Sequence, residues 1–152
     1  MGGFMNRKVI ISIILVIIWM SIIFIFSNMN NRESNGHSKG IINSIVEKFT
    51  GNSNNTILVN KLNKPFRKIM HFSVYLVLSI LIIHTLNIYN SNIHHKYIIV
   101  IIICFLYSLT DEFHQTFISG RSGEIMDSII DTIGSIVGVY LYNIIKKNSN
   151  NK

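Results

Sequence analysis

The residue types best suited to chemistry lie in one stretch of the sequence, Asp111 to Asp131, which reads DEFHQTFISGRSGEIMDSIID. Five of the chain's seven acidic residues fall in it, together with a histidine, a glutamine and an arginine: Asp111, Glu112, His114, Gln115, Arg121, Glu124, Asp127 and Asp131. Apolar runs at 97–107 and 133–145 flank the stretch. Ionisable groups are costly at membrane depth, so this cluster predicts a functional site.

A second polar group, RKIMHFSVY at 67–75, opens another apolar run. His71, Tyr75 and Ser79 follow one another at i, i+4 and i+8, so they share one helix face. Arg67 and Lys68 precede them and add positive charge.

These residue types permit several kinds of chemistry. Glu112 or His114 is the candidate general acid or base, and Arg121 and Arg67 suit binding of phosphate. Histidine with carboxylates also binds divalent metals. No spaced ligand motif is present, so we expect no metal and no cofactor. A purely structural ion-pair network that locks the helices together is the alternative.

Composition identifies the class of protein. The 152-residue chain is 49% hydrophobic and only 14% charged, with a mean hydropathy of +0.40, whereas soluble domains carry about 25% charged residues. The formal charge is +7. Its basic residues flank apolar runs, which favours anionic lipid headgroups and not nucleic acid as partners.

Four segments are candidates for membrane spans, at about 9–26, 66–88, 97–118 and 124–147. The first is an uncleaved anchor by our reading, because its apolar run is longer than that of a signal peptide and no small-x-small cleavage site follows. Pro65 suits the start of the second span. The third span must continue past its apolar part to Ile118 to cross the membrane. This brings the first acidic residues of the cluster into the last third of that span.

The polar segment between the first two spans contains apolar residues at helical spacing: Ile41, Ile42, Ile45, Val46 and Phe49. They predict a short amphipathic helix at the membrane surface, capped by Ser34 or Ser38. Packing of the same face on the other helices is an alternative, and the two are compatible. The expected fold is an all-α integral membrane bundle of about four transmembrane helices with a short interfacial amphipathic helix.

Domain limits and topology follow from the charges. We expect a cytoplasmic tail at 1–8, a membrane domain at 9–146 and a disordered tail at 147–152. Basic pairs at 7–8 and 146–147 place both termini in the cytoplasm under the positive-inside rule, although four basic residues between 61 and 68 oppose that orientation. Gly134 and Gly138 form a G-x-x-x-G that allows close helix contact within or between chains, so the oligomeric state stays open.

In this arrangement, the starts of the second and fourth spans and the end of the third meet at one membrane face. The predicted site comprises Arg67, Lys68, His71, Tyr75, Asp111, Glu112, His114, Gln115, Gly120, Arg121, Glu124, Asp127 and Asp131.

These residues carry a family resemblance. The segment 67–75 resembles the R-K-x-x-H-F-x-x-Y signature of the VanZ-like family, and 108–115 resembles its S/T-D-E-x-H-Q signature. The segment from Gly120 to Asp127, with Asp131 and Gly134, is similar to its G-R-x-G-x-x-x-D-x-x-x-D/N-x-x-G signature. The resemblance covers about residues 9–145. One departure is Ile118-Ser119, where the family often has a proline before its glycine.

The resemblance implies a multi-pass protein of the bacterial cell membrane, because the family's founding members are small membrane proteins associated with teicoplanin resistance. The first hypothesis is therefore lowered susceptibility to lipoglycopeptides through binding of the drug, a lipid-linked wall precursor or lipid headgroups. An enzyme acting on a lipid-linked precursor or lipid phosphate is the alternative, and a proton or ion pathway is a third. The sequence does not decide whether the chain is catalytic.

Overall fold

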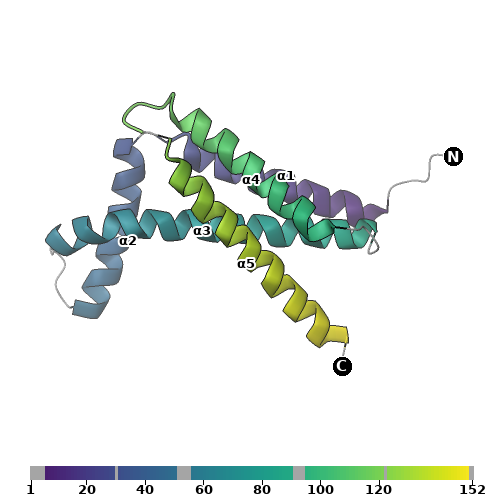
Figure 1. Cartoon of the computed structure of the whole chain (residues 1–152). Helices are drawn as coiled ribbons and strands as arrows, with labels where there is room; N and C mark the ends of the chain where they lie inside the picture. Colours follow the sequence, from purple (N-terminus) through teal and green to yellow (C-terminus); the bar gives the residue numbers. More distant parts are fainter. Residues whose placement is uncertain (1–5, 30, 51–55, 91–94, 122, 151–152) are drawn as a thin grey trace.

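The computed structural model describes residues 6–29, 31–50, 56–90, 95–121 and 123–150, and Figure 1 shows their arrangement. These residues form five helices: α1 (Arg7–Ser27), α2 (Asn31–Thr50), α3 (Thr56–Tyr89), α4 (Lys96–Gln115) and α5 (Ile125–Asn150). All except α2 are long and apolar enough to cross a membrane. The prediction of an all-α membrane bundle with about four spans is confirmed.

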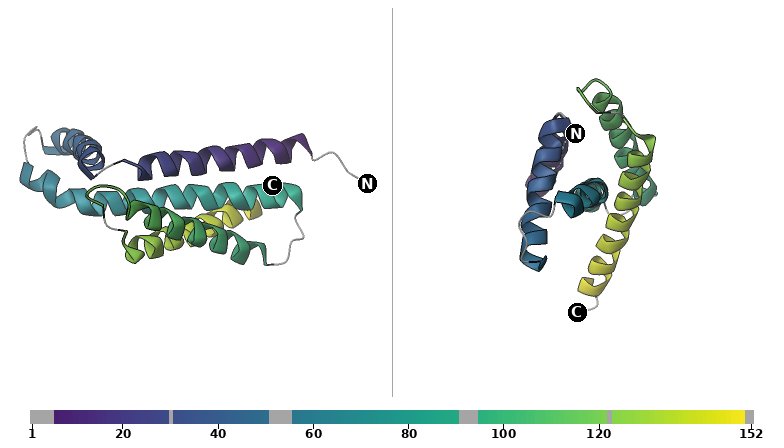
Figure 2. Two further views of the ribbon diagram at one scale, coloured as in Figure 1. Left: turned by 90° about the horizontal axis from the view of Figure 1, so that it is seen from above. Right: turned by 90° about the vertical axis from the view of Figure 1, so that its left-hand side faces the viewer.

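Helix α3 is the centre of the bundle and is in contact with each of the other four helices. Seen from above, α1 lies along one side of α3, and α4 and α5 lie along the other (Figure 2). The buried core includes Tyr75, Leu78 and Ile83 of α3 and Val100 and Cys104 of α4. Many large apolar side chains remain exposed on the outer faces of the spans, as expected where the surrounding solvent is lipid.

Two glycines let α5 approach α3 closely. A Cβ atom on Gly134 would clash with the backbone carbonyl of Phe72, and one on Gly138 would clash with the carbonyl of Leu76 and the hydroxyl of Ser79. The G-x-x-x-G motif therefore makes a contact between two helices of the same chain.

Helix α2 crosses the first turns of α3 instead of running along the bundle (Figure 1). Ile42 and Val46 are buried against Val59 of α3, whereas Ile41 and Ile45 stay exposed. The apolar residues of α2 thus divide between packing on α3 and an outward surface. This confirms the packing alternative for Ile42 and Val46.

The predicted caps of this helix were wrong. Helix α2 begins at Asn31, before both Ser34 and Ser38. The Ser38 hydroxyl donates to the Ser34 carbonyl at 2.9 Å, inside the helix. Serine makes such bonds to the preceding turn readily, so its presence alone did not mark a helix start.

The predicted helix start at Pro65 was also wrong. Pro65 lies inside α3, which begins at Thr56. An interior proline removes one backbone hydrogen bond and costs about 3 kcal/mol. The turns before it are stabilised by packing on α2, where Val59, Leu58 and Phe66 contribute apolar surface.

The remaining ends differ by a few residues. Helix α1 starts at Arg7, where the Asn6 side chain accepts a bond from the Lys8 amide. Helix α4 ends at Gln115, three residues before the predicted end. Helix α5 continues to Asn150, so residues 147–150 of the expected disordered tail are helical, with Lys147 near the negative end of the helix dipole. Residues 1–5 and 151–152 lie outside the described residues.

Candidate functional site

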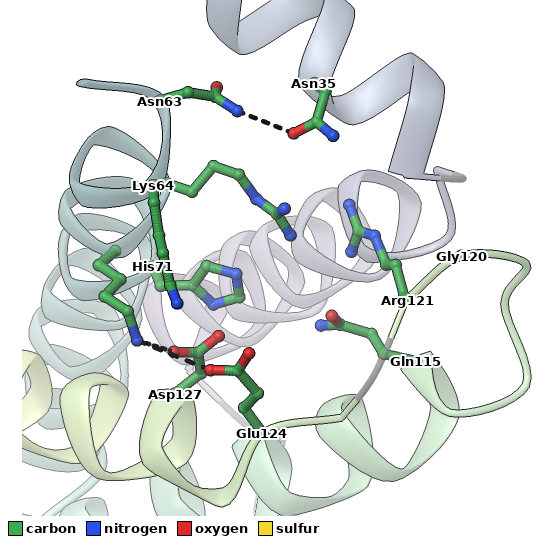
Figure 3. Close-up of a pocket in the computed structure, with 11 residues that line it drawn as sticks. Asn35, Asn63, Lys64, His71, Gln115, Gly120, Arg121, Glu124 and Asp127 are labelled. Carbon is green, nitrogen blue, oxygen red and sulfur yellow. Dashed lines mark hydrogen bonds and ion pairs between the residues drawn. The ribbon is translucent and has the colours of Figure 1, made fainter. Parts of the chain in front are cut away.

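A polar cavity of about 320 Å³ opens at the end of the bundle where α4 ends and α5 begins. Figure 3 shows side chains from α2, α3, α5 and the α4–α5 connection converging on it. The lining residues are Asn35, Asn63, Lys64, Arg67, Lys68, His71, Gln115, Gly120, Arg121, Glu124 and Asp127. The cavity is therefore bounded by segments far apart in the sequence.

The turn after α4 directs Arg121 toward the cavity. Gly120 has a φ of 75°, a left-handed conformation that glycine adopts without strain. The Arg121 Nη1 then donates to the carbonyl of Ser27 at the end of α1, at 3.0 Å. Burial lowers the pKa of Arg121 from its ordinary value, and the nearby positive charge of Arg67 lowers that pKa further.

Two guanidinium groups therefore line one cavity. Arg67 makes no hydrogen bond or ion pair with another described residue, and the buried Nε of Arg121 has no hydrogen-bond partner among them. Arginine stays protonated in proteins. Two positive charges held near one another repel, and an anion bound between them relieves that repulsion.

Lys68 differs from these arginines because it already has acidic partners. Its ammonium group lies 2.7 Å from Asp127 and 3.9 Å from Glu124, and Figure 3 shows these two carboxylates together on the side of α5. This group joins the start of α5 to α3.

The end of α4 forms a buried carboxylate group. The Gln115 amide donates to Asp111 at 3.1 Å and to Glu112 at 3.4 Å. The other Glu112 oxygen accepts from the Glu124 backbone amide at 2.9 Å, at the beginning of α5. Glu112 thereby satisfies one of the amides that the start of a helix leaves unpaired.

Gly123 is required for this contact, because a Cβ there would clash with the backbone carbonyl of Glu112.

Below the cavity, Asp131 of α5 is completely buried. Ser108 of α4 donates to its Oδ2 at 2.6 Å, and the Nδ1 of His71 lies 3.5 Å from its Oδ1. Tyr75, also fully buried, packs its ring 6.1 Å from the ring of Tyr107. These groups bring α3, α4 and α5 together.

His114 lies apart from this group. Its ring centroid is 4.8 Å from that of Phe24 on α1, and it is absent from the residues that line the cavity. His71 is instead the imidazole at the cavity wall. Of the two predicted acid–base candidates, Glu112 thus sits within the polar cluster and His114 faces α1.

Buried polar atoms without a hydrogen-bond partner are concentrated in this region. Among the described residues they include the side-chain atoms Ser27 Oγ, His71 Nδ1, Tyr75 Oη, Asp111 Oδ1, His114 Nδ1, Arg121 Nε, Ser128 Oγ and Asp131 Oδ1. Such atoms are rare in folded proteins and call for an explanation at each site. They lie at one end of the bundle, where water or a bound ligand would satisfy them.

The structure brings nearly all predicted site residues to one end of the bundle, but it divides them between the cavity wall and a buried layer. Tyr75, Asp111, Glu112 and Asp131 belong to the buried layer. Their functional roles remain predictions.

Sequence reasoning missed three lining residues, Asn35, Asn63 and Lys64. Asn63 donates to Asn35 at 2.9 Å and links α3 to α2. Only the position of Lys64, beside the Arg67-Lys68 signature, gave any signal in the sequence.

The bond between Ser108 and Asp131 provides a stability test. Ser108→Ala leaves a buried carboxylate oxygen without its donor, so we expect a loss of about 1–3 kcal/mol in the free energy of unfolding. Thermal unfolding in detergent micelles measures it. Ser44→Ala is the control, because the hydroxyl of that exposed serine donates to the Gly40 carbonyl within α2, and its loss should change stability by less than about 0.5 kcal/mol. Equal effects of the two changes would contradict a role for the buried bond.

No curated protein and no solved structure matches the chain. The sequence profile of the VanZ/LLP1 family matches residues 12–146, a range that contains all the predicted site residues. Since that match spans most of the sequence, the chain belongs to the VanZ/LLP1 family.

Proposed function

We propose that the cavity binds the anionic, phosphate-bearing headgroup of a membrane lipid or a lipid-linked wall precursor, and that this binding lowers susceptibility to lipoglycopeptide antibiotics such as teicoplanin. The observation that carries the proposal is the pair Arg67 and Arg121, two guanidinium groups that line one cavity without a carboxylate partner among the described residues.

The chemistry of the pair favours phosphate. A guanidinium donates two parallel hydrogen bonds to phosphate oxygens, which gives both strength and orientation. Lys64 lines the same cavity and adds a third cation. The carboxylates Asp127 and Glu124 are paired with Lys68, so they oppose an incoming anion less than free acids would.

The position of the cavity suits a lipid ligand. It lies at the end of four helices that could each cross a membrane, beside α2 with its exposed Ile41 and Ile45. A headgroup entering here would leave its tail along the apolar outer surface of the bundle. The resistance role further requires this end to face outward, as the predicted cytoplasmic termini imply.

A binding assay tests the lipid half of the proposal. Purified chain in nanodiscs of phosphatidylcholine would be titrated with a fluorescent short-chain prenyl phosphate and with the matching prenyl alcohol. We expect saturable binding of the phosphate alone. Arg121→Gln should weaken it by about 10- to 100-fold, since a hydrogen bond to a charged group contributes about 1.5–3 kcal/mol.

The control for this assay is Lys147→Gln, which removes one exposed positive charge near the end of α5. It should bind like wild type. Equal binding of phosphate and alcohol, or equal losses in the two variants, would contradict a phosphate site formed by these arginines.

Growth inhibition tests the resistance half. A sensitive Gram-positive host would carry wild type, Arg67→Gln, Asp111→Asn or an empty vector, with membrane levels matched, in teicoplanin and vancomycin. We expect wild type alone to protect. If wild type gives no protection against either drug, the resistance role fails for this chain, while the binding assay still decides the lipid site.

A second candidate is hydrolysis of a lipid phosphate ester. One observation favours it: the cavity wall includes His71, backed by the buried carboxylate of Asp131. A histidine oriented by a carboxylate is a common general base. Release of inorganic phosphate from a labelled prenyl phosphate, lost in His71→Ala, would support this reaction, and no release by wild type would remove it.

A further inference from the structure

Three side chains from three different helices converge beneath the cavity: His71 of α3, Glu112 of α4 and Asp131 of α5. Each offers one ligand atom, and these atoms all lie within 4.8 Å of one another. One imidazole nitrogen and two carboxylate oxygens form a donor set that suits Zn²⁺ or Mn²⁺.

The buried carboxylate of Asp131 has an oxygen available to a ligand. Asp131 is 0% exposed, and its Oδ1 has no hydrogen-bond partner among the described residues. The nearby Nδ1 of His71 also has none, and the 3.5 Å between these two atoms is longer than a normal hydrogen bond. Two buried atoms of the kind that bind metals thus face each other at ion-pair distance.

Surrounding groups hold the two acids in place. Ser108 donates to the other oxygen of Asp131 at 2.6 Å, and the Glu124 backbone amide donates to Glu112 at 2.9 Å. Metal ligands are typically fixed by such outer hydrogen bonds.

The charge balance also favours a cation. Buried carboxylates need a compensating positive charge. Lys68 is already paired with Asp127 at 2.7 Å, and His71 carries a positive charge beside Asp131 only when its ring is protonated. A divalent ion would neutralise Glu112 and Asp131 together.

We propose that His71, Glu112 and Asp131 bind one divalent cation of the Zn²⁺ or Mn²⁺ class at the base of the cavity. Coordination at about 2.0–2.2 Å draws the three side chains closer together than their present separation. Because His71 lines the cavity, the remaining coordination positions of the ion face the cavity. A phosphate oxygen would bind there, and this binding of phosphate rests on the proposed function. The metal site itself does not.

Metal binding by the full chain tests the site directly. Tag-free protein in neutral detergent, stripped with a chelator and free of added lipid, would be titrated with Zn²⁺ and with Mn²⁺, the latter followed by electron paramagnetic resonance. We expect one ion per chain. His71→Ala and Asp131→Asn should each weaken the affinity by about 10-fold or more, the loss seen when even supporting residues of metal sites change.

Matched controls are His84→Ala and Glu47→Gln, which remove the same chemical groups at exposed positions of α3 and α2. They should keep the affinity of wild type. X-ray absorption of the Zn²⁺-loaded wild type adds a readout independent of how the variants fold, with one imidazole nitrogen and carboxylate oxygens expected as ligands. No saturable binding by wild type, a metal shell without imidazole, or equal affinities in ligand variants and controls would overturn the site.

The two proposals fail separately. If the chain binds no metal, the nanodisc titration still tests prenyl phosphate binding through Arg67 and Arg121. If the chain binds metal but no prenyl phosphate, the headgroup proposal is contradicted. The metal site then stands, and its open coordination positions take another ligand.

Discussion

Changing Arg67 to glutamate is expected to lower the affinity for prenyl phosphate by about 100-fold or more, with little change in the stability of the fold. The change removes a guanidinium donor, worth about 1.5–3 kcal/mol at a charged hydrogen bond, and adds a negative charge beside the ligand. Stability should be preserved because Arg67 makes no hydrogen bond or ion pair with another described residue. Titration in nanodiscs and thermal unfolding measure the two effects.

A graded series of substitutions at Arg67 separates charge from shape. Arg67→Lys keeps the charge but loses the planar fork, so its affinity should fall between wild type and Arg67→Gln, with Arg67→Glu weakest. Lys147→Glu is the matched reversal at the far end of α5 and should leave the affinity unchanged. If Lys147→Glu matched Arg67→Glu, general surface charge and not the cavity would govern binding.

Much of the fold could be predicted because membrane spans follow from composition. The apolar runs located the four long helices, and the alternating direction of successive spans placed their polar ends together. Asp127 and Asp131, both predicted site residues, turn toward α3, where they meet Lys68 and His71.

The remaining errors have local physical causes. The early turns of α3 carry Asn, Lys and Pro65, so their intrinsic pattern is poor, and packing of Val59 on α2 decides their conformation. Likewise Asn35 reaches the cavity only because α2 crosses α3. Contacts between segments distant in sequence leave no local pattern.

The candidate metal site also could not be predicted from a local sequence pattern. His71, Glu112 and Asp131 come from three helices, so no ligand spacing within one segment could reveal them. Helical spacing placed His71 on one face with Tyr75 and Ser79, but the distances among the three candidate ligands depend on how closely α5 approaches α3. That approach is set by Gly134 and Gly138, one and two turns after Asp131.

Gly134→Ala is therefore expected to have a large structural effect. Its Cβ would clash with the backbone carbonyl of Phe72, which no side-chain rotation can relieve. Overpacking of this kind costs about 1–3 kcal/mol or more, and we expect about 3 kcal/mol here because two helices must separate. Thermal unfolding in micelles measures the loss.

The same change should weaken Zn²⁺ binding in the protein that remains folded, because separating α5 from α3 moves Asp131 away from His71. Gly40→Ala is the matched control: it lies in α2 with nothing within 4 Å of the added Cβ, and alanine there should stabilise the helix by about 0.5–1 kcal/mol. If Gly134→Ala unfolded at the wild-type temperature and bound Zn²⁺ equally well, the close contact between α3 and α5 would not be what positions the carboxylate against the imidazole.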